Sequence, residues 1–183
     1  PPNMPDPRFR KSVVYIWRHD VSGAAGVVIN KRCQQPDFRH ICNEGTIHRL
    51  PKVNHPVYYG GPILTNVVGV LHSTDFILTS TNTLTEDKVG FTLDRKMLEV
   101  IARGQGPKNM LITLGMANWT TGQLEEELEH PRNPAMSWLI MDYDEKFVFG
   151  QLDEDKPDDL WERSVSEAIR AKTREITSKV FKD

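Results

Sequence analysis

The sequence predicts an α+β fold built on a mixed or antiparallel sheet. Its predicted strands come mostly in neighbouring pairs, and its helical patterns are late and interspersed, which argues against a doubly wound parallel sheet. A chain of 183 residues, 38% of them hydrophobic, suits one domain and is long enough to bury a core. We therefore expect residues 1–183 to form a single domain, with 160–183 as a C-terminal helix.

Four strands are predicted in the first part of the chain. Their Val, Ile and Tyr content is typical of strands, and they cover residues 12–18, 25–31, 57–60 and 68–72. The first two are joined by a turn at 19–23, and the last two flank Gly61-Pro62. Residues 33–56 carry scattered Pro, Asn and Gly without a hydrophobic period, so they are expected to be mainly loop. The threonine-rich stretch 76–92 is expected to add one or two short strands.

A helix is predicted for residues 95–103. Asp94 has the side chain of a good N-cap, because its carboxylate can accept hydrogen bonds from the free amides of the first helical turn. Leu98 and Ile101 recur at helical spacing and start an apolar face. Gly104 follows as a residue that readily takes the left-handed conformation found at the ends of helices.

A buried strand that turns into a capped helix is predicted next. The apolar run 111–114 forms the strand, and Gly115 is expected to end it. Thr120 and Gln123 have the spacing of a capping box, in which side chains satisfy the free amides of the first helical turn. Leu124 and the leucine four residues later then give the helix an apolar stripe.

The last part of the chain is predicted to hold a hairpin and a long helix. Residues 136–141 and 146–150 are expected to pair through a turn at 143–145. The longest helical pattern, 160–181, is expected to dock on the sheet through Trp161, Val165, Ile169 and Ile176. Because a small fold can hardly cover the last two turns, we expect the far end to contact a protein partner or a second copy. The residues predicted for this contact are Ile176, Val180 and Phe181.

The stretch from Gly115 to Leu128 resembles the Gly-x-Ala-Gly-Trp-x-x-Gly-Gln-Leu-Glu-x-Glu-Leu signature of the YqgE/AlgH family. Further stretches in the family's order support the resemblance, namely Met4–Phe9 followed by Ser12–Ile16, Tyr59–Pro62 and Leu71–Ser73. The resemblance covers nearly the whole chain and implies a sheet curled into a partial barrel with helices packed outside it. The family comprises bacterial and phage proteins, some labelled transcriptional regulators, and its members usually begin with a short apolar strand. We therefore expect the natural chain to begin further upstream.

Composition argues against several classes of protein. The formal net charge is −2, and acidic residues gather at Glu125–Glu129, whereas a DNA-binding domain usually has a basic face. No apolar run approaches the roughly 20 residues that cross a bilayer. Two cysteines, Cys33 and Cys42, do not make a secreted disulfide framework. The chain is therefore expected in the cytoplasm, or in the host cytoplasm if it is viral, without bound nucleic acid or membrane.

Two short motifs are candidates for chemistry. His72-Ser73 offers a base and a nucleophile, but neighbouring residues in a strand point to opposite faces, and the chain has no Gly-x-Ser-x-Gly elbow. Gly60-Gly61 could cradle an anion with its amides or could simply let the backbone approach another part of the chain. The family commonly has an Arg at the position of Val68, and its absence here removes the usual partner of a phosphate. We therefore expect no catalytic residues.

The histidines and cysteines of the loop segment are a weaker candidate. They are Cys33, His40, Cys42, His48 and His55. Their spacing lacks the short Cys-x₂₋₄-Cys pattern of zinc sites, so we expect no metal and no cofactor. Trp119, at the corner between strand and helix, and Trp138 are expected to lie in the core or line a groove.

These observations favour a non-enzymatic binding protein that acts through protein–protein contact, with a regulatory outcome implied by the family resemblance. Three alternatives remain. The first is a module that binds a small metabolite or nucleotide, with a site formed by Gly60, Gly61, His72, Ser73, Asn118 and Trp119. The second is a hydrolase that uses His72. The third is a DNA-binding transcriptional regulator.

Overall fold

A computed structural model describes residues 6–45, 47, 49–83, 88–129, 138–150 and 159–180, the side chains of 159 and 175–180 excepted. Its strands form one sheet in the order β1-β2-β7-β4-β6-β5, with β3 paired to β7. The strands are β1 (Val14–Asp20), β2 (Gly23–Val28), β3 (Val57–Tyr59), β4 (Ile63–Ser73), β5 (Asn82–Thr83), β6 (Val89–Thr92) and β7 (Met110–Thr120). The predicted α+β class with a mostly antiparallel sheet is confirmed.

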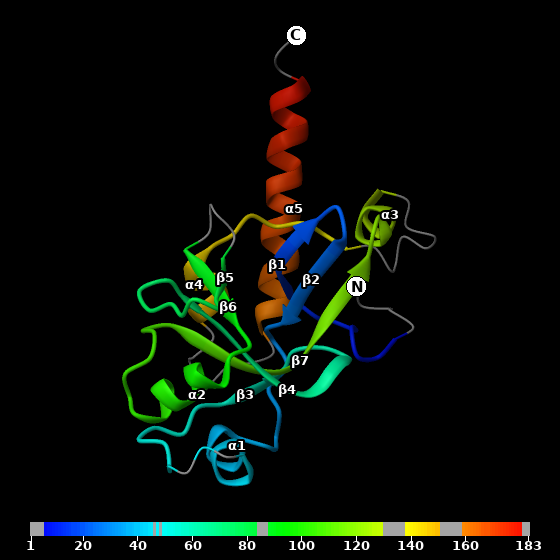
Figure 1. Ribbon diagram of the computed structural model, residues 1–183. Helices are drawn as coiled ribbons and strands as arrows, with labels where there is room; N and C mark the ends of the chain where they lie inside the picture. Colours follow the sequence, from blue (N-terminus) through cyan, green and yellow to red (C-terminus); the bar gives the residue numbers. More distant parts are fainter. Residues whose placement is uncertain are drawn as a thin grey trace.

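The sheet curls until it is nearly closed into a barrel (Figure 1). Its two edge strands, β1 and β5, come close to each other. Trp17 of β1 stacks on Phe91 of β6, with ring centroids 4.7 Å apart. Stacked aromatic rings of this kind add to the apolar area that they bury, so they help to hold the two ends of the sheet together.

Strand β7 is the centre of the sheet. Along one edge it pairs in parallel with β3 and antiparallel with β2, and along the other edge it pairs antiparallel with β4. The prediction that Gly115 ends this strand is wrong. Gly115 takes a positive φ of 76°, which bends the strand instead of ending it, and pairing with β2 resumes at Ala117.

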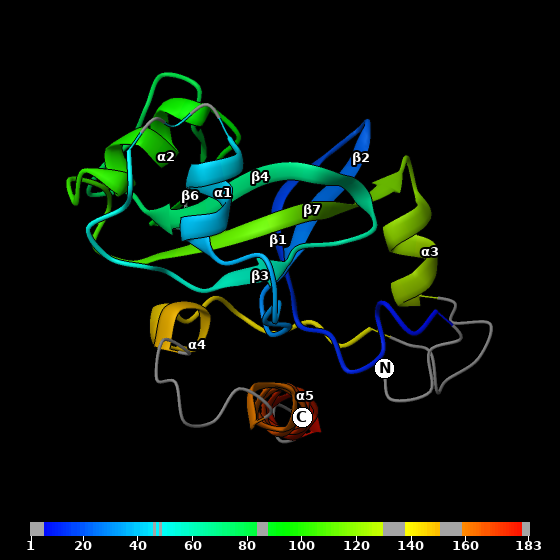
Figure 2. The ribbon, with the colours of Figure 1, turned by 90° about the horizontal axis from the view of Figure 1, so that it is seen from below.

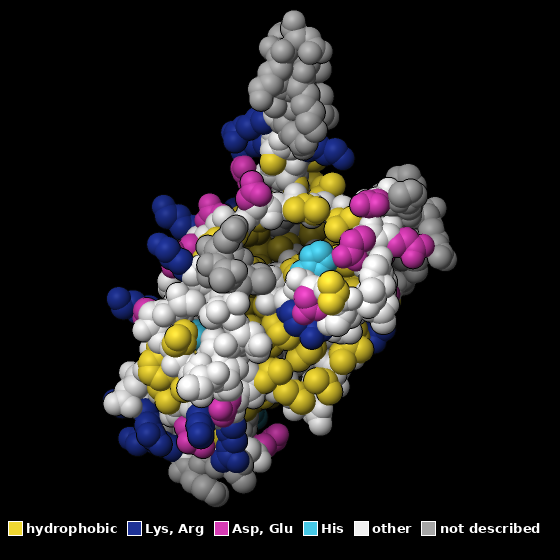
Figure 3. Space-filling model, turned by 45° about the horizontal axis from the view of Figure 1, so that its top comes forward, with side chains coloured by type: hydrophobic (Ala, Val, Ile, Leu, Met, Phe, Trp, Pro, Cys, Tyr) yellow, Lys and Arg dark blue, Asp and Glu magenta, His cyan; other side chains and the backbone are white. Residues whose placement is uncertain are grey.

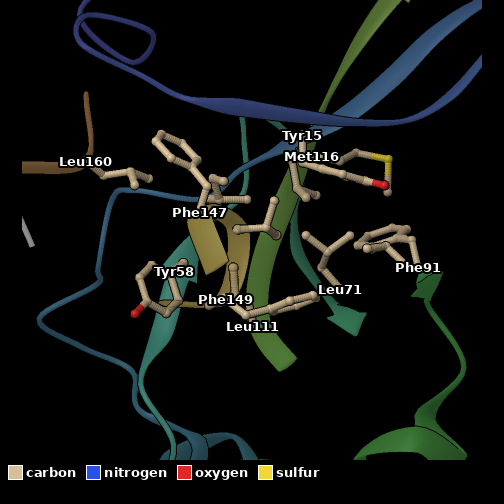
Figure 4. Packing of buried hydrophobic residues seen from close by; sticks show 13 residues of the cluster. Tyr15, Tyr58, Leu71, Phe91, Leu111, Met116, Phe147, Phe149 and Leu160 are labelled. Carbon is tan, nitrogen blue, oxygen red and sulfur yellow. The ribbon is translucent and has the colours of Figure 1, made fainter. Parts of the chain in front are cut away.

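Helices cover both faces of the sheet. They are α1 (Phe38–Glu44), α2 (Arg95–Ala102), α3 (Gln123–Glu129), α4 (Glu145–Phe149) and α5 (Asp159–Val180). Figure 2 shows α1 and α2 on one side of the sheet and α4 and α5 on the other. Successive residues of β7 divide between these sides, because Ile112 packs in the cluster of α1 and α2, whereas Leu111 packs in the cluster of α4 and α5. Figure 4 shows the second cluster around Leu111, Phe147 and Phe149.

One predicted helix start is confirmed in detail, and a second is confirmed in part. The Asp94 carboxylate accepts a hydrogen bond from the Lys96 amide at 2.9 Å, and Gly104 follows α2 with a φ of 71°. At α3, Gln123 Oε1 accepts the Thr120 amide at 3.0 Å and the Thr120 hydroxyl at 3.2 Å. Of the two reciprocal bonds of the predicted capping box, the structure shows the one from the Thr120 amide to the Gln123 side chain, whereas the Thr120 hydroxyl donates to Gln123.

One other prediction is refined and another is wrong. The described residues of 33–56 are mainly loop as predicted, but they also contain α1, whose start is capped by the Asp37 carboxylate. The predicted hairpin after Pro134 is wrong where the structure describes it. Residues 145–149 form α4, and its three consecutive apolar residues Phe147, Val148 and Phe149 are all buried. The first part of that hairpin, 136–137, lies outside the described residues.

Candidate functional site

His72 lies buried in β4 with both of its ring nitrogens engaged. Its Nδ1 lies 2.9 Å from the carbonyl oxygen of Ser73, and its Nε2 lies 2.8 Å from Thr92 Oγ1. A carbonyl can only accept, so Nδ1 carries the proton and Nε2 accepts from the Thr92 hydroxyl. That hydroxyl lies 2.8 Å from Thr81 Oγ1, which accepts the Leu78 amide. The chain of hydrogen bonds runs in one direction and ends on a neutral imidazole.

Burial lowers the pKa of His72 and keeps the ring neutral. The Ser73 hydroxyl is not its partner, because that hydroxyl donates to Asp75 Oδ1 and accepts the Asn109 amide. A base and a nucleophile must lie within hydrogen-bond reach of each other. In this arrangement the His72-Ser73 pair ties β4 to β6 and to the loop before β7.

The two glycines of the second motif lie against β7. A Cβ on Gly60 would lie 2.2 Å from the carbonyl oxygen of Gly115, and one on Gly61 would lie 2.2 Å from the carbonyl carbon of Met116. The Gly60 amide donates to the Leu114 carbonyl at 2.7 Å, and the Gly60 carbonyl accepts the Val28 amide at 2.8 Å. These glycines permit a close backbone crossing within the chain, which was the alternative to an anion site.

Trp119 is 5% exposed and belongs to an aromatic cluster beside α3. Its indole N–H donates to Glu127 Oε2 at 3.1 Å, and the indole N–H of Trp138 donates to the same oxygen at 2.8 Å. The two rings meet edge to face, 6.2 Å apart. The second oxygen of Glu127 accepts the Gln123 amide side chain. One glutamate of the acidic stretch therefore holds two tryptophans together.

The six predicted ligand residues do not form one site. His72 pairs with Met110 at the start of β7, nine residues before Trp119 near its end. Asn118 is exposed, while its neighbour Trp119 points into the aromatic cluster. Of the six, Trp119 lines a large cavity between the barrel and α5, and the other five are not part of its lining.

That cavity, which we call the apolar hollow, measures about 690 Å³ and lies between the barrel and α5. Its described lining comes from 12–16, Ile29, Trp119, Leu124, Leu128, 138–144, Phe147, Val148, Trp161, Ser164, Val165 and Ala168. Figure 3 shows it as a depression floored by hydrophobic side chains at the foot of α5. Residues from five separate parts of the chain meet here.

Sequence reasoning missed this site, although β1 carried a signal for it. The run from Val13 to Ile16 is apolar without alternation, which is typical of a strand covered on both faces. Tyr15 packs in the cluster of α4 and α5, and Val14 and Ile16 pack against the cluster of Trp119. An edge strand with two apolar faces needs other residues to cover both of them. In this fold the hollow lies between β1 and α5, so that cover is incomplete.

Helix α5 borders the hollow with its first turns. Leu160 and Ala168 are buried, and Trp161 and Val165 are partly buried. The expectation that Ile169 docks is wrong, because its side chain is 55% exposed. The four residues after Arg170 are exposed as well, and the helix projects from the body there (Figure 1). The side chains of Ile176, Val180 and Phe181 lie outside the described residues.

The residues considered for a metal site have other environments. Cys42 is buried beside Phe38, and His40 Nδ1 lies 2.6 Å from the Asp37 carboxylate that caps α1. His48 lies outside the described residues. Within the described part of the chain, no three acidic, histidine or cysteine side chains are placed to hold one ion. Nor does any helix in that part combine the length and apolarity needed to span a membrane.

Comparisons with known proteins give consistent results. A family model described as AlgH-like matches residues 1–171. A UPF0301 protein of Bradyrhizobium is 35% identical over 165 residues, covering 86% of this chain and 74% of its own. One of Cereibacter sphaeroides is 38% identical over 156 residues, covering 85% and 82%. The solution structure of the AlgH protein from Pseudomonas aeruginosa matches with a TM-score of 0.70 and 28% identity, over 92% of this chain and 84% of that one.

Proposed function

Because this chain belongs to the AlgH-like family, whose names specify neither a reaction nor a ligand, we propose its function from the geometry: it is a non-enzymatic protein that binds a protein partner. The apolar hollow receives apolar side chains of that partner. A regulatory outcome of the binding is part of the proposal. The motifs that could have served catalysis support it, because His72 and the two glycines are engaged in holding the barrel together.

The observation that carries the proposal is an apolar rim beside the hollow. Leu139 is 50% exposed and Ile140 is 70% exposed, and both also line the hollow. Together they extend the apolar lining outward onto the surface. A contiguous exposed apolar patch of this kind is typical of a protein interaction site. A small ligand inside the hollow would leave the outward parts of these two side chains in water, whereas a protein surface would cover them.

A second candidate function is the binding of a small apolar ligand. The volume of the hollow favours it, because ligand pockets usually measure about 300–1,000 Å³ and this one measures about 690 Å³. This candidate and the main proposal differ in one respect. A small ligand would depend on the space inside the hollow, and a protein partner would depend on the space and on the rim.

Two variants and a control separate these functions. Ile140→Ser removes apolar surface from the rim, and Val165→Phe fills part of the hollow. Ile77→Ser is the matched control, because Ile77 is also exposed, at 57%, and lies outside the hollow lining. The immobilised variants are exposed to a lysate of the native host, and each retained protein is quantified. In parallel, each variant is titrated with an apolar fluorescent dye.

The proposal expects a protein that is retained by the wild type and by Ile77→Ser and is lost with both Ile140→Ser and Val165→Phe. If Val165→Phe abolishes dye binding while Ile140→Ser changes neither dye binding nor the retained proteins, the small-ligand function is the better one. If all variants retain the same proteins and bind the dye equally, the hollow has neither function.

A further inference from the structure

We infer that the partner segment received by the apolar hollow carries Lys or Arg beside its apolar residues. This inference rests on the proposed function and adds the chemistry of the partner. It starts from the charges that border the hollow, because apolar packing gives affinity whereas charges at the edge of an interface select between partners.

The charged residues among the described lining are both acidic. They are Asp142 and Asp144, and the remaining lining residues are apolar, aromatic or serine. Both aspartates are exposed, so they lie where the hollow opens to water. They belong to the same short segment as Leu139 and Ile140. An apolar rim and two carboxylates therefore lie within six consecutive residues.

Asp144 is held in place by the start of α4. Its Oδ1 accepts the Phe147 amide at 3.1 Å, and it is the N-cap of that helix. A carboxylate that is already fixed loses less side-chain entropy when it pairs with a cation, and that entropy is a large part of what makes exposed ion pairs weak. Asp144 is thus better prepared than a free surface aspartate to bind Lys or Arg.

Basic groups also lie near the hollow. Lys146, Arg163 and Arg170 line a second cavity together with Asp144, and two basic groups are directed at aromatic rings. Lys11 Nζ lies 5.3 Å from the ring centre of Trp161, and the Arg163 guanidinium lies 5.7 Å from that of Phe147. Neither residue is part of the hollow lining. Figure 3 shows acidic side chains over α3 and both acidic and basic side chains beside α5. Asp142 and Asp144 are therefore the charged groups of the hollow's own described lining.

Charge complementarity then selects the occupant. An apolar segment flanked by Lys or Arg places its cations opposite Asp142 and Asp144, whereas flanking Glu or Asp would meet like charge. Each exposed pair is expected to change affinity about two- to five-fold. The effect must also weaken with salt, because the Debye length falls from about 30 Å at 0.01 M to about 3 Å at 1 M.

The test uses the full chain and three synthetic peptides with one leucine-rich core flanked by Lys, Gln or Glu. Binding is followed by the fluorescence of the indoles that line the hollow. The Lys-flanked peptide should bind about two- to five-fold more tightly per pair than the Gln-flanked one, and the Glu-flanked peptide should bind most weakly. These differences should shrink at high salt.

Matched variants test whether the preference for the Lys-flanked peptide depends on the two aspartates. Asp142→Asn and Asp144→Asn should each reduce the preference for the Lys-flanked peptide, and Asn keeps the capping ability of residue 144. Glu44→Gln, on the exposed end of α1, should leave the preference unchanged. Equal affinity for all three peptides, or a preference that survives both Asn variants, would overturn the inference while leaving the proposed function intact. Failure of every peptide to bind would overturn both.

Discussion

Replacing Trp119 with alanine is expected to destabilise the fold severely. The indole is 5% exposed, meets Trp138 edge to face and donates to Glu127. Loss of a buried Trp side chain typically costs about 3–5 kcal/mol, which is a large share of the roughly 5–15 kcal/mol that stabilises a protein. At about 2–4 °C per kcal/mol for a chain of this size, the melting temperature should fall by roughly 6–20 °C.

Urea unfolding followed by far-UV circular dichroism measures this loss. Trp119→Phe serves as a second variant, because it keeps an aromatic ring and loses the N–H donor, and its loss should be clearly smaller. Val21→Ala, at an exposed turn position, should change stability by less than about 0.5 kcal/mol. An unfolding free energy of Trp119→Ala within about 1 kcal/mol of the wild type would refute the structural role of the ring. If a binding activity were lost at the same time, Trp119 would be a binding residue.

Four further predictions can be tested. Thr120→Ala should cost about 1 kcal/mol or less and Gln123→Ala more, as measured by urea unfolding, because Gln123 Oε1 accepts both capping bonds. The pKa of His72 is lowered in the fold, so as the pH falls the imidazole is protonated in the unfolded chain before it is protonated in the folded one. The free energy of unfolding should therefore decline below about pH 6.5, by at most about 1.4 kcal/mol per pH unit. His72→Gln should flatten that decline, and an unchanged slope would contradict the assignment. Duplex DNA should bind weakly or not at all in a fluorescence-anisotropy titration, and nanomolar, sequence-specific binding at physiological salt would overturn this expectation. Removal of 179–183 should leave the unfolding curve intact and weaken association in sedimentation experiments, and a truncated chain that does not fold would disprove it.

The sequence predicted those elements that are specified by residues close together along the chain. The β1–β2 pair, the capped start of α2 at Asp94 and the extent of α5 all follow from residue types and spacing within a short window. The elements that were missed depend on distant contacts. Helix α1 has seven residues, and its buried Phe38 and Cys42 pack in a cluster with residues of α2. Helix α4 presents three buried apolar residues in a row, a pattern that a strand would share.

The site was harder to predict than the fold for the same reason. The motif residues His72, Gly60 and Gly61 stand in suggestive pairs, but their partners are backbone and hydroxyl groups elsewhere in the barrel. The hollow is formed by ordinary apolar residues such as Val14 and Val165, which have no distinctive signature. Only the non-alternating apolar run in β1 indicated that other residues must pack on both faces of this strand.

The central position of β7 has a consequence for the emergence of the chain from the ribosome. The pairing partners of β2, β3 and β4 on β7 all lie between Met110 and Thr120. At about 5–20 residues per second, translation needs roughly 5–20 s to pass from the end of β2 to the end of β7. During that interval the edge of β2 that later meets β7 has no native partner, and unpaired edges favour association with other chains. Nascent copies on one messenger RNA would therefore be most exposed to mispairing before Thr120 emerges from the ribosome, and a chaperone that covers strand edges would act in this window.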